Sequence, residues 1–149
     1  MSLWLRPAEP MDAAAVAAIL GAFVDQTPWM PRLHSRAEDI AHCGQMIDRG
    51  WVTIAMTADR VAGFLARDGD EINSLYIAPG SRRQGVGRQL IEDAKAQVDR
   101  LVLWTFVANV GALRFYDRMG FVELSRGTGA GNEEGLPDVQ LAWTRGSTA

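Results

Sequence analysis

The sequence lacks the features that define several protein classes. It has one cysteine, Cys43, which excludes an intrachain disulfide framework and a multi-cysteine zinc site. No apolar run approaches the roughly 18 residues of a membrane-spanning helix, and the opening residues MSLWLRPAEP lack a signal-peptide layout. Neither sign of charge dominates, since the net charge is −3, so nothing favours nucleic acid or anionic lipid. We expect a cytoplasmic protein without a metal site that binds neither nucleic acid nor membrane.

What remains is an ordinary globular composition, with 48% hydrophobic and 22% charged residues. The length predicts a single domain over residues 1–149. Asp12 is placed to cap the first helix, and Ser35 with Glu38 forms a capping box for the second. The expected elements are a strand at 3–5, helices at 13–24 and 36–49, strands at 51–56, 61–66 and 71–77, a helix at 85–98, a strand at 101–104, a helix at 110–119, and strands at 121–125 and 139–143. This order predicts an α+β fold with a mostly antiparallel sheet and helices on its faces.

Four residues carry expectations about the core. Trp51, Trp104 and Trp143 lie in predicted strands, so we expect all three to be buried. Cys43 shares its helix face with two isoleucines, which favours a small buried hydrophobic residue over an acyl-carrying nucleophile.

A glycine-rich turn precedes the helix predicted at 85–98. Gly85 and Gly87 remove Cβ atoms where a ligand would approach the backbone, and the N-terminus of the helix offers unpaired N–H groups. Three arginines add positive charge to this turn: Arg82, Arg83 and Arg88. The combination predicts a phosphate or pyrophosphate site.

Familiar nucleotide motifs do not explain this turn. A Walker loop needs Gly-Lys-Ser/Thr, whereas Arg88 follows Gly87 here. A dinucleotide fingerprint needs a third glycine where this chain has Leu90, and it needs a parallel βαβ context. A helix that starts with glycines beside a solvated basic patch is the remaining alternative.

Two motifs together resemble the GNAT superfamily of N-acetyltransferases. Its signature (Gln/Arg)-x-x-Gly-x-(Gly/Ala) is matched by Arg82, Gly85 and Gly87. The stretch 109–121 is similar to the family's N-x-x-A-x-x-F-Y-x-x-x-G-F run, and the strand before the loop, 75–79, is similar too. The expected element order also fits the family from end to end. The resemblance implies a three-layer α/β/α arrangement around a mixed, mostly antiparallel sheet whose fourth and fifth strands splay apart.

The resemblance also implies a ligand, acetyl-CoA, as the acyl donor. The glycine-rich loop would cradle its pyrophosphate, and the pantetheine arm would insert between the splayed strands and bond to the strand backbone. The cofactor-binding residues implied in this way are Tyr76, Ile77, Arg82, Arg83, Gln84, Gly85, Val86, Gly87, Arg88, Asn109 and Tyr116. For Asn109 the structural alternative is an N-cap of the helix that it precedes.

Tyr116 corresponds to the tyrosine that many family members place near the departing sulfur, which implies a proton donor; the alternative is that it only packs its helix on the sheet. Deprotonation of the amine needs a base or a water chain. Glu71 is our catalytic candidate because strand alternation could turn it toward the cleft. His34 and the pair Glu133–Glu134 are further candidates, whereas we expect His42 at the surface.

The resemblance also implies that the acceptor enters between the region of the first two helices on one side and the loop that joins the last two strands on the other. Trp29 on one side and Glu133 with Glu134 on the other would suit a cationic amine. We therefore expect an N-acetyltransferase that moves the acetyl group to a primary amine of a small molecule or peptide by direct attack in a ternary complex. The alternatives are a non-catalytic acyl-CoA-binding or sensor domain and transfer of a longer acyl group. The sequence leaves a homodimer open.

Overall fold

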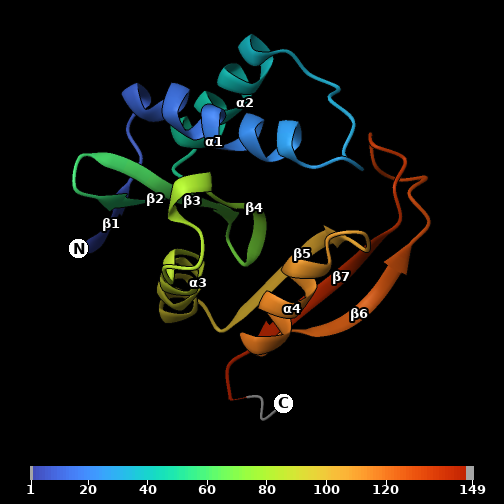
Figure 1. Cartoon of the computed structure of the whole chain (residues 1–149). Helices are drawn as coiled ribbons and strands as arrows, with labels where there is room; N and C mark the ends of the chain where they lie inside the picture. Colours follow the sequence, from blue (N-terminus) through green and yellow to red (C-terminus); the bar gives the residue numbers. More distant parts are fainter. Residues whose placement is uncertain (1, 147–149) are drawn as a thin grey trace.

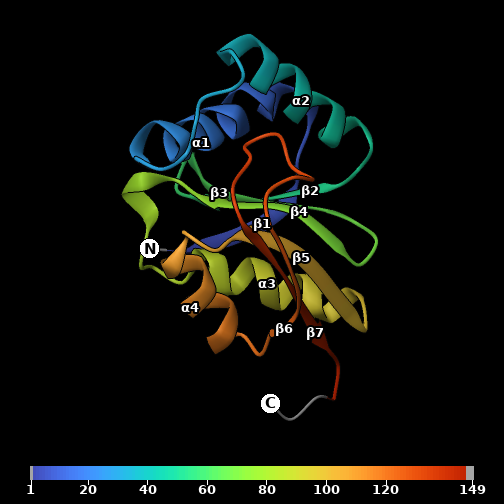
Figure 2. The ribbon, with the colours of Figure 1, turned by 90° about the vertical axis from the view of Figure 1, so that its right-hand side faces the viewer.

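The computed structural model describes residues 2–146, in which one seven-stranded sheet lies between two layers of helices (Figures 1 and 2). The strand order is β1-β2-β3-β4-β5-β7-β6. The strands are β1 (Leu3–Pro7), β2 (Val52–Thr57), β3 (Arg60–Asp68), β4 (Glu71–Ile77), β5 (Arg100–Phe106), β6 (Val122–Gly127) and β7 (Asp138–Thr144). The helices are α1 (Ala13–Gln26), α2 (Arg36–Asp48), α3 (Val86–Gln97) and α4 (Val110–Arg118), with short 3-10 turns at Pro10–Asp12 and Pro79–Ser81. All pairs are antiparallel except β4–β5, which confirms the expected fold class.

Each face of the sheet has its own hydrophobic core. On one face, α1 and α2 pack over the β1–β4 side, where Phe64 and Met46 are buried (Figure 2). On the other face, α3 packs against the sheet through Leu90 and Ile91, which meet Leu65. Neighbouring residues 64 and 65 of β3 therefore belong to different cores, as the alternation of side chains along a strand requires.

The helix starts are set by local chemistry, and one expectation about them is wrong. The capping box is confirmed: the Glu38 N–H donates to Ser35 Oγ at 3.1 Å, and the Ser35 N–H donates to Glu38 Oε1 at 2.8 Å. Asp12 does precede α1, but among the described residues its carboxylate makes no capping bond to that helix. It instead accepts hydrogen bonds from Arg6 at 2.9 and 3.0 Å and from the Glu9 N–H at 2.7 Å. A buried carboxylate is stabilised more by a bidentate guanidinium than by a single backbone amide.

The boundaries of all helices and strands named above fall within two residues of the expected ones, and the main correction concerns Trp104 of β5. This side chain is 48% exposed instead of buried. By strand alternation, Trp104 lies on the same face of the sheet as Val102, the face that α1 and α2 cover. These helices lie over β1–β4 and leave the part of β5 around Trp104 uncovered (Figure 1). Trp51 and Trp143 are half-buried against the two cores. Cys43 is buried as expected, and burial raises its pKa to about 11.

The two central strands separate along their length, as the resemblance implied. Within the described residues β4 and β5 share one register pair, Glu71 with Val102, beside a hydrogen bond of 2.9 Å from the Val102 N–H to the Asp70 carbonyl. Beyond this point β4 stays paired with β3 up to Ile77, and β5 stays paired with β7 up to Phe106. The sheet therefore opens between the carboxyl ends of β4 and β5.

Candidate active site

A cavity lies on each face of the sheet beside this opening. The first, here called the α3/α4 cavity, has a volume of about 860 Å³ and is lined by Leu75 and Ile77 of β4. The second, the α1/α2 cavity, measures about 320 Å³ and is lined by Ser74 and Tyr76 of the same strand. Because side chains alternate along β4, this strand forms a wall of both cavities, and the β4–β5 opening lies between them.

The loop before α3 lies at one end of the α3/α4 cavity, and its backbone has the form that the sequence predicted for an anion site. Arg83 and Gly85 both have positive φ, +63° and +79°, a conformation that turns successive N–H groups toward one side. The first helical bond of α3 runs from the Gln89 N–H to the Gly85 carbonyl at 3.0 Å. The N–H groups of residues 86–88 precede that bond, so they are available to a ligand.

Two glycines let the surrounding elements approach this loop closely. A Cβ built on Gly63 of β3 would lie 2.9 Å from Ile77 Cδ1 and 3.0 Å from Val86 Cγ1. A Cβ built on Gly87 would lie 3.3 Å from the Cζ atom of Phe115 in α4. Close packing of β3, α3 and α4 around the loop therefore depends on the absence of side chains at these two positions.

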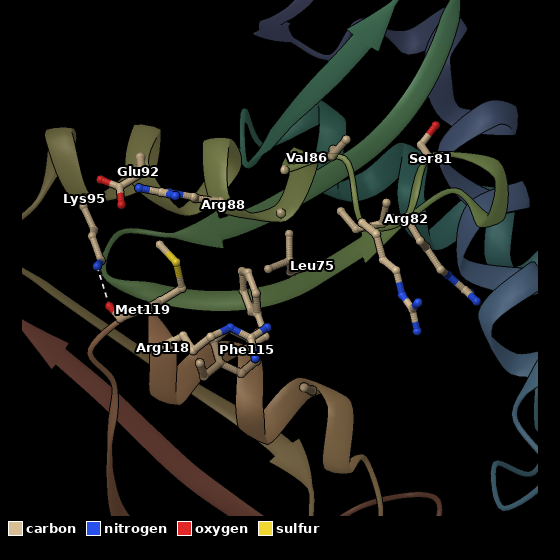
Figure 3. Close-up of a pocket in the computed structure, with 16 residues that line it drawn as sticks. Leu75, Ser81, Arg82, Val86, Arg88, Glu92, Lys95, Phe115, Arg118 and Met119 are labelled. Carbon is tan, nitrogen blue, oxygen red and sulfur yellow. Dashed lines mark hydrogen bonds between the residues drawn. The ribbon is translucent and has the colours of Figure 1, made fainter.

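The α3/α4 cavity is strongly cationic. Five cations line it, together with one carboxylate, Glu92; the cations are Arg82, Arg83, Arg88, Lys95 and Arg118. Figure 3 shows Arg82 near the loop and Arg88, Glu92 and Lys95 along α3, with Arg118 on α4. Within residues 2–146 none of the four arginines has an ion-pair partner, whereas Lys95 donates a hydrogen bond to the Met119 carbonyl. These residues fit a phosphorylated ligand with several negative charges.

The edge of β4 that faces the opening carries free backbone groups. The Ala78 N–H donates to the Ala62 carbonyl at 2.8 Å, so the backbone of residue 78, and by alternation that of Tyr76, faces β3. The backbone groups of Leu75 and Ile77 therefore face the opening. Ile77 was expected here, and Tyr76 was expected here too but its backbone is used by β3. The sequence interpretation missed Leu75, which the alternation along an antiparallel hairpin could have indicated.

Two other expected coenzyme contacts lie outside both cavities. Gln84 is exposed, and its Nε2 atom lies 3.5 Å from the Gly80 carbonyl. Asn109 caps α4, because its Oδ1 atom accepts a hydrogen bond of 3.1 Å from the Ala112 N–H. The expected N-cap role of Asn109 is thus confirmed. A coenzyme-binding role for Gln84 and Asn109 stays a prediction.

Tyr116 belongs both to the core and to the wall of the α3/α4 cavity. Its ring packs between Phe115 and Phe121, with centroid distances of 5.2 Å to each. Burial, and to a lesser degree the neighbouring Tyr76, raises its pKa above the ordinary value of a phenol. The hydroxyl therefore stays protonated at neutral pH, and its role as a proton donor stays a prediction.

Aromatic rings form one side of the α1/α2 cavity. Tyr76, Phe23 and Phe106 line it, and the Tyr76 ring lies 5.0 Å from the Phe23 ring. Trp29 does not line the cavity but packs behind it, edge to face with Phe23 at 6.3 Å and with Phe106 at 5.8 Å. Trp29 therefore does not contact the cavity as expected, but packs against two rings that line it.

Acidic and imidazole groups form the other side of this cavity. Glu133 and Glu134 come from the segment between β6 and β7, and His34 lies just before α2. His34 Nε2 lies 3.0 Å from Glu133 Oε2. Burial, followed by the charge of Glu134, raises the pKa of Tyr76 to about 12. Both glutamates line this cavity, and their contact with an acceptor stays a prediction. His42 is exposed as expected and also lines the cavity.

Glu71 does not lie in this region. It is exposed at the start of β4, where β4 and β5 are still paired, and it lines neither cavity. A β-bulge also interrupts the strand alternation that predicted its direction, because Ala66 pairs with Ser74 whereas Arg67 pairs with Ile72. The strands, moreover, separate at the other end of β4. The structure thus gives Glu71 no contact with the cavities.

Residues 2–146 lack the features of a membrane-spanning helix and of a metal site. No helix in that range is long and apolar enough to cross a membrane. Nor does that range contain a group of three or more His, Cys, Asp or Glu residues arranged to hold a metal ion.

Comparison with known proteins identifies relatives of one kind. A family model described as an acetyltransferase (GNAT) domain matches residues 47–123. The peptidyl-lysine N-acetyltransferase YjaB of Salmonella typhimurium is 34% identical over 71 residues, which cover 48% of this chain and 48% of the relative. An uncharacterized N-acetyltransferase of Methanocaldococcus jannaschii, MJ1207, is 36% identical over 75 residues, 47% of this chain and 33% of the relative. The matched part thus spans half or less of these curated relatives.

Solved structures match over nearly the whole chain. Apo-form YjaB from Escherichia coli has a TM-score of 0.79 at 25% identity and covers 95% of this chain and 97% of its own. A GCN5-related N-acetyltransferase from Rhodopseudomonas palustris has a TM-score of 0.80 at 25% identity, covering 97% and 96%. The fold of yncA from Salmonella typhimurium, solved with its cofactor acetyl-CoA, matches with a TM-score of 0.74 at 20% identity, covering 100% and 97%. With a family model over half of its residues and this fold, the chain belongs to the GNAT acetyltransferase family.

Proposed function

We propose that this protein transfers an acetyl group from acetyl-CoA to a primary amine, by direct attack in a ternary complex. The single observation that carries the proposal is the opening between β4 and β5 with a cavity on each face of the sheet. The cationic α3/α4 cavity suits the phosphorylated donor, and the smaller α1/α2 cavity suits the acceptor. The two substrates would meet at the wall that β4 provides.

The chain's own groups would act in a defined order. The N–H groups of residues 86–88 and the arginines around them bind the phosphates of the donor. The backbone of Leu75 and Ile77 pairs with the donor arm as a missing strand would, and one N–H there polarises the acetyl carbonyl. Both are contacts that hold and activate the thioester without a covalent bond to the protein.

A cationic acceptor first gives up a proton to water in the α1/α2 cavity. The neutral amine nitrogen then attacks the acetyl carbon and the C–S bond breaks. The departing thiolate takes a proton from the Tyr116 hydroxyl, and the amine loses a proton toward the water and the carboxylates of the α1/α2 cavity. Solvent then returns a proton to Tyr116, so the protein ends unchanged. The products are the N-acetylated amine and CoA thiol.

The acceptor that this cavity favours is a cationic amine with an apolar body. Phe23, Phe106 and Tyr76 provide apolar contacts, and Glu133 and Glu134 attract positive charge. The Salmonella relative is named a peptidyl-lysine N-acetyltransferase, and a lysine side chain has this chemistry. Lysine-containing peptides therefore belong among the acceptors to be tested.

The test is release of CoA thiol from acetyl-CoA with a panel of amines: lysine peptides, peptide N-termini, polyamines, amino acids and aminoglycosides. We expect amine-dependent release and an acetylated product of matching amount for at least one class. Binding of acetyl-CoA without release for any amine would instead support a non-catalytic acyl-CoA-binding domain. Acetyl-CoA and longer acyl-CoA thioesters compared with the best amine then define the acyl group.

A further inference from the structure

Tyr76 is the tyrosine on the acceptor side of β4. Its side chain lines the α1/α2 cavity, whereas those of its chain neighbours Leu75 and Ile77 line the α3/α4 cavity. The backbone groups of the same two neighbours face the β4–β5 opening. Tyr76 therefore stands between the two residues whose backbone would hold the donor arm, with its side chain on the side of the acceptor.

Packing holds the Tyr76 ring from two directions. The ring centroid lies 5.0 Å from that of Phe23 in α1 and 5.9 Å from that of Phe64, which is paired with Tyr76 in β3. Phe64 is fully buried. These contacts involve the ring alone, so they fix where the hydroxyl lies without using it.

The hydroxyl of Tyr76 is open to the cavity. Within residues 2–146 it forms no hydrogen bond with another protein group. In the same range every buried side-chain nitrogen or oxygen has a hydrogen-bond partner, so this hydroxyl is not buried, and the cavity that its side chain lines is the α1/α2 cavity. Tyrosine hydroxyls in a protein interior usually find a partner. This one is left free to pair with a ligand.

Two titratable groups from different cavities lie near this hydroxyl. Burial, followed by the negative charge of Glu134, raises the pKa of Tyr76 to about 12. Burial, followed by the charge of Tyr76, raises the pKa of Tyr116. Because such effects fall with distance, the Tyr76 hydroxyl is close both to a carboxylate of the α1/α2 cavity and to the proposed proton donor of the α3/α4 cavity. It therefore lies where acceptor and donor would meet.

We propose that the Tyr76 hydroxyl accepts a hydrogen bond from the acceptor amine and thereby aims the nitrogen at the acetyl carbon. This inference rests on the proposed function, because it assumes that the acceptor occupies the α1/α2 cavity. A neutral primary amine has two N–H groups and one lone pair. When one N–H donates to the Tyr76 oxygen and the other to water or the Glu134 carboxylate, the lone pair is directed at the opening, where the thioester lies. Tyr76 neither gains nor loses a proton in this role.

The test uses Tyr76→Phe, which keeps the ring packed on Phe23 and Phe64 and removes only the hydroxyl. With the best amine of the panel, kcat/KM should fall about tenfold, the upper range for one neutral hydrogen bond. The dissociation constant of acetyl-CoA should be unchanged, since the backbone that would hold the donor arm is the same. Thermal stability should not fall, because the hydroxyl has no partner in the described protein. Ser125→Ala is the matched control, because it removes a hydroxyl of β6 that lines neither cavity.

The pH dependence of kcat/KM distinguishes a hydrogen-bond acceptor from a base. Its shape should be the same in Tyr76→Phe as in the wild-type protein, and loss of one ionisation from the profile would make Tyr76 a base and overturn the inference. Wild-type kcat/KM in the variant would overturn it as well, while the proposed function stands. So would an equal loss of acetyl-CoA affinity or a loss of thermal stability, which would mark a structural residue. If the wild-type protein acetylates no amine, the proposed function and the inference fail together.

Discussion

His34 Nε2 lies 3.0 Å from Glu133 Oε2, a contact that joins the segment before α2 to the segment between β6 and β7. Both residues line the α1/α2 cavity, so the contact closes one side of the proposed acceptor site. It links two parts of the chain about 100 residues apart and brings a carboxylate to a cavity whose other side is aromatic.

The first prediction concerns these carboxylates. The double variant Glu133→Gln/Glu134→Gln should raise the KM of a cationic acceptor several-fold and leave the KM of acetyl-CoA unchanged. Glu133 is exposed and Glu134 is half-buried, so the effect should shrink with added salt, which screens exposed charges over about 10 Å at 0.1 M. Glu123→Gln on the outer strand β6 is the control. An acceptor KM unaffected by the double variant would reduce the pair to a solvated loop.

The second prediction concerns the phosphate loop. Gly87→Val should weaken CoA binding by more than about tenfold, because the new side chain would lie against Phe115 and narrow the cavity beside the loop amides. Gly44→Val, at a helix position where a Cβ meets nothing within 4 Å, is the matched control. Calorimetry with CoA measures both. A folded Gly87→Val protein with wild-type affinity would remove the loop from the binding site.

The third prediction concerns the proton donor. Tyr116→Phe keeps the ring packed between Phe115 and Phe121 and removes only the hydroxyl. General acid catalysis contributes about 10²- to 10⁴-fold, so kcat should fall by at least the lower figure, and the CoA dissociation constant should stay within a few-fold. Single-turnover rates make the chemical step visible. Full activity of Tyr116→Phe would mean that the thiolate leaves without this proton.

The fourth prediction uses the fact that the chain has two tyrosines, Tyr76 and Tyr116. Burial raises the pKa of Tyr76 to about 12 and that of Tyr116 also above its ordinary value. The folded protein should show little phenolate absorbance at about pH 11, where the urea-unfolded chain, with pKa values near 10, is mostly ionised. Folded-state ionisation near pH 10 would contradict the burial of both rings.

The raised pKa values of the two tyrosines also determine how the free energy of unfolding should change at high pH. Below pH 10 both tyrosines are protonated whether the chain is folded or not, so they add no pH dependence there. Above pH 10 the unfolded chain loses phenolic protons first, and the free energy of unfolding should fall as the pH rises toward about 12. Tyr76→Phe should reduce the slope of that fall in urea titrations.

The sequence predicted the fold and the glycine-rich turn before α3 because both depend on local signals. Residues 35 and 38 set the start of α2 by capping, and Gly85 is required where the backbone turns to positive φ. The resemblance added the splayed strands, which no local pattern contains. Trp104 could not be placed in this way, because its exposure depends on which part of the sheet α1 and α2 cover.

The acceptor side was less accessible to sequence reasoning. The resemblance placed Glu133 and Glu134 at the acceptor entrance. That His34 and His42 line the same cavity depends on the orientation of α2, which only the structure shows. The prediction for Glu71 failed for two reasons: a β-bulge between Ile72 and Ser74 breaks the simple alternation along β4, and β4 separates from β5 at its other end.

The most direct test of the central claim is the initial-rate pattern with acetyl-CoA and the best amine of the panel. If donor and acceptor meet across β4, reciprocal plots of rate at several fixed amine concentrations should intersect, as they do for attack within a ternary complex. Parallel lines would indicate a covalent acyl-enzyme and contradict direct transfer. Absence of amine-dependent thiol release with every acceptor would contradict the proposed activity altogether.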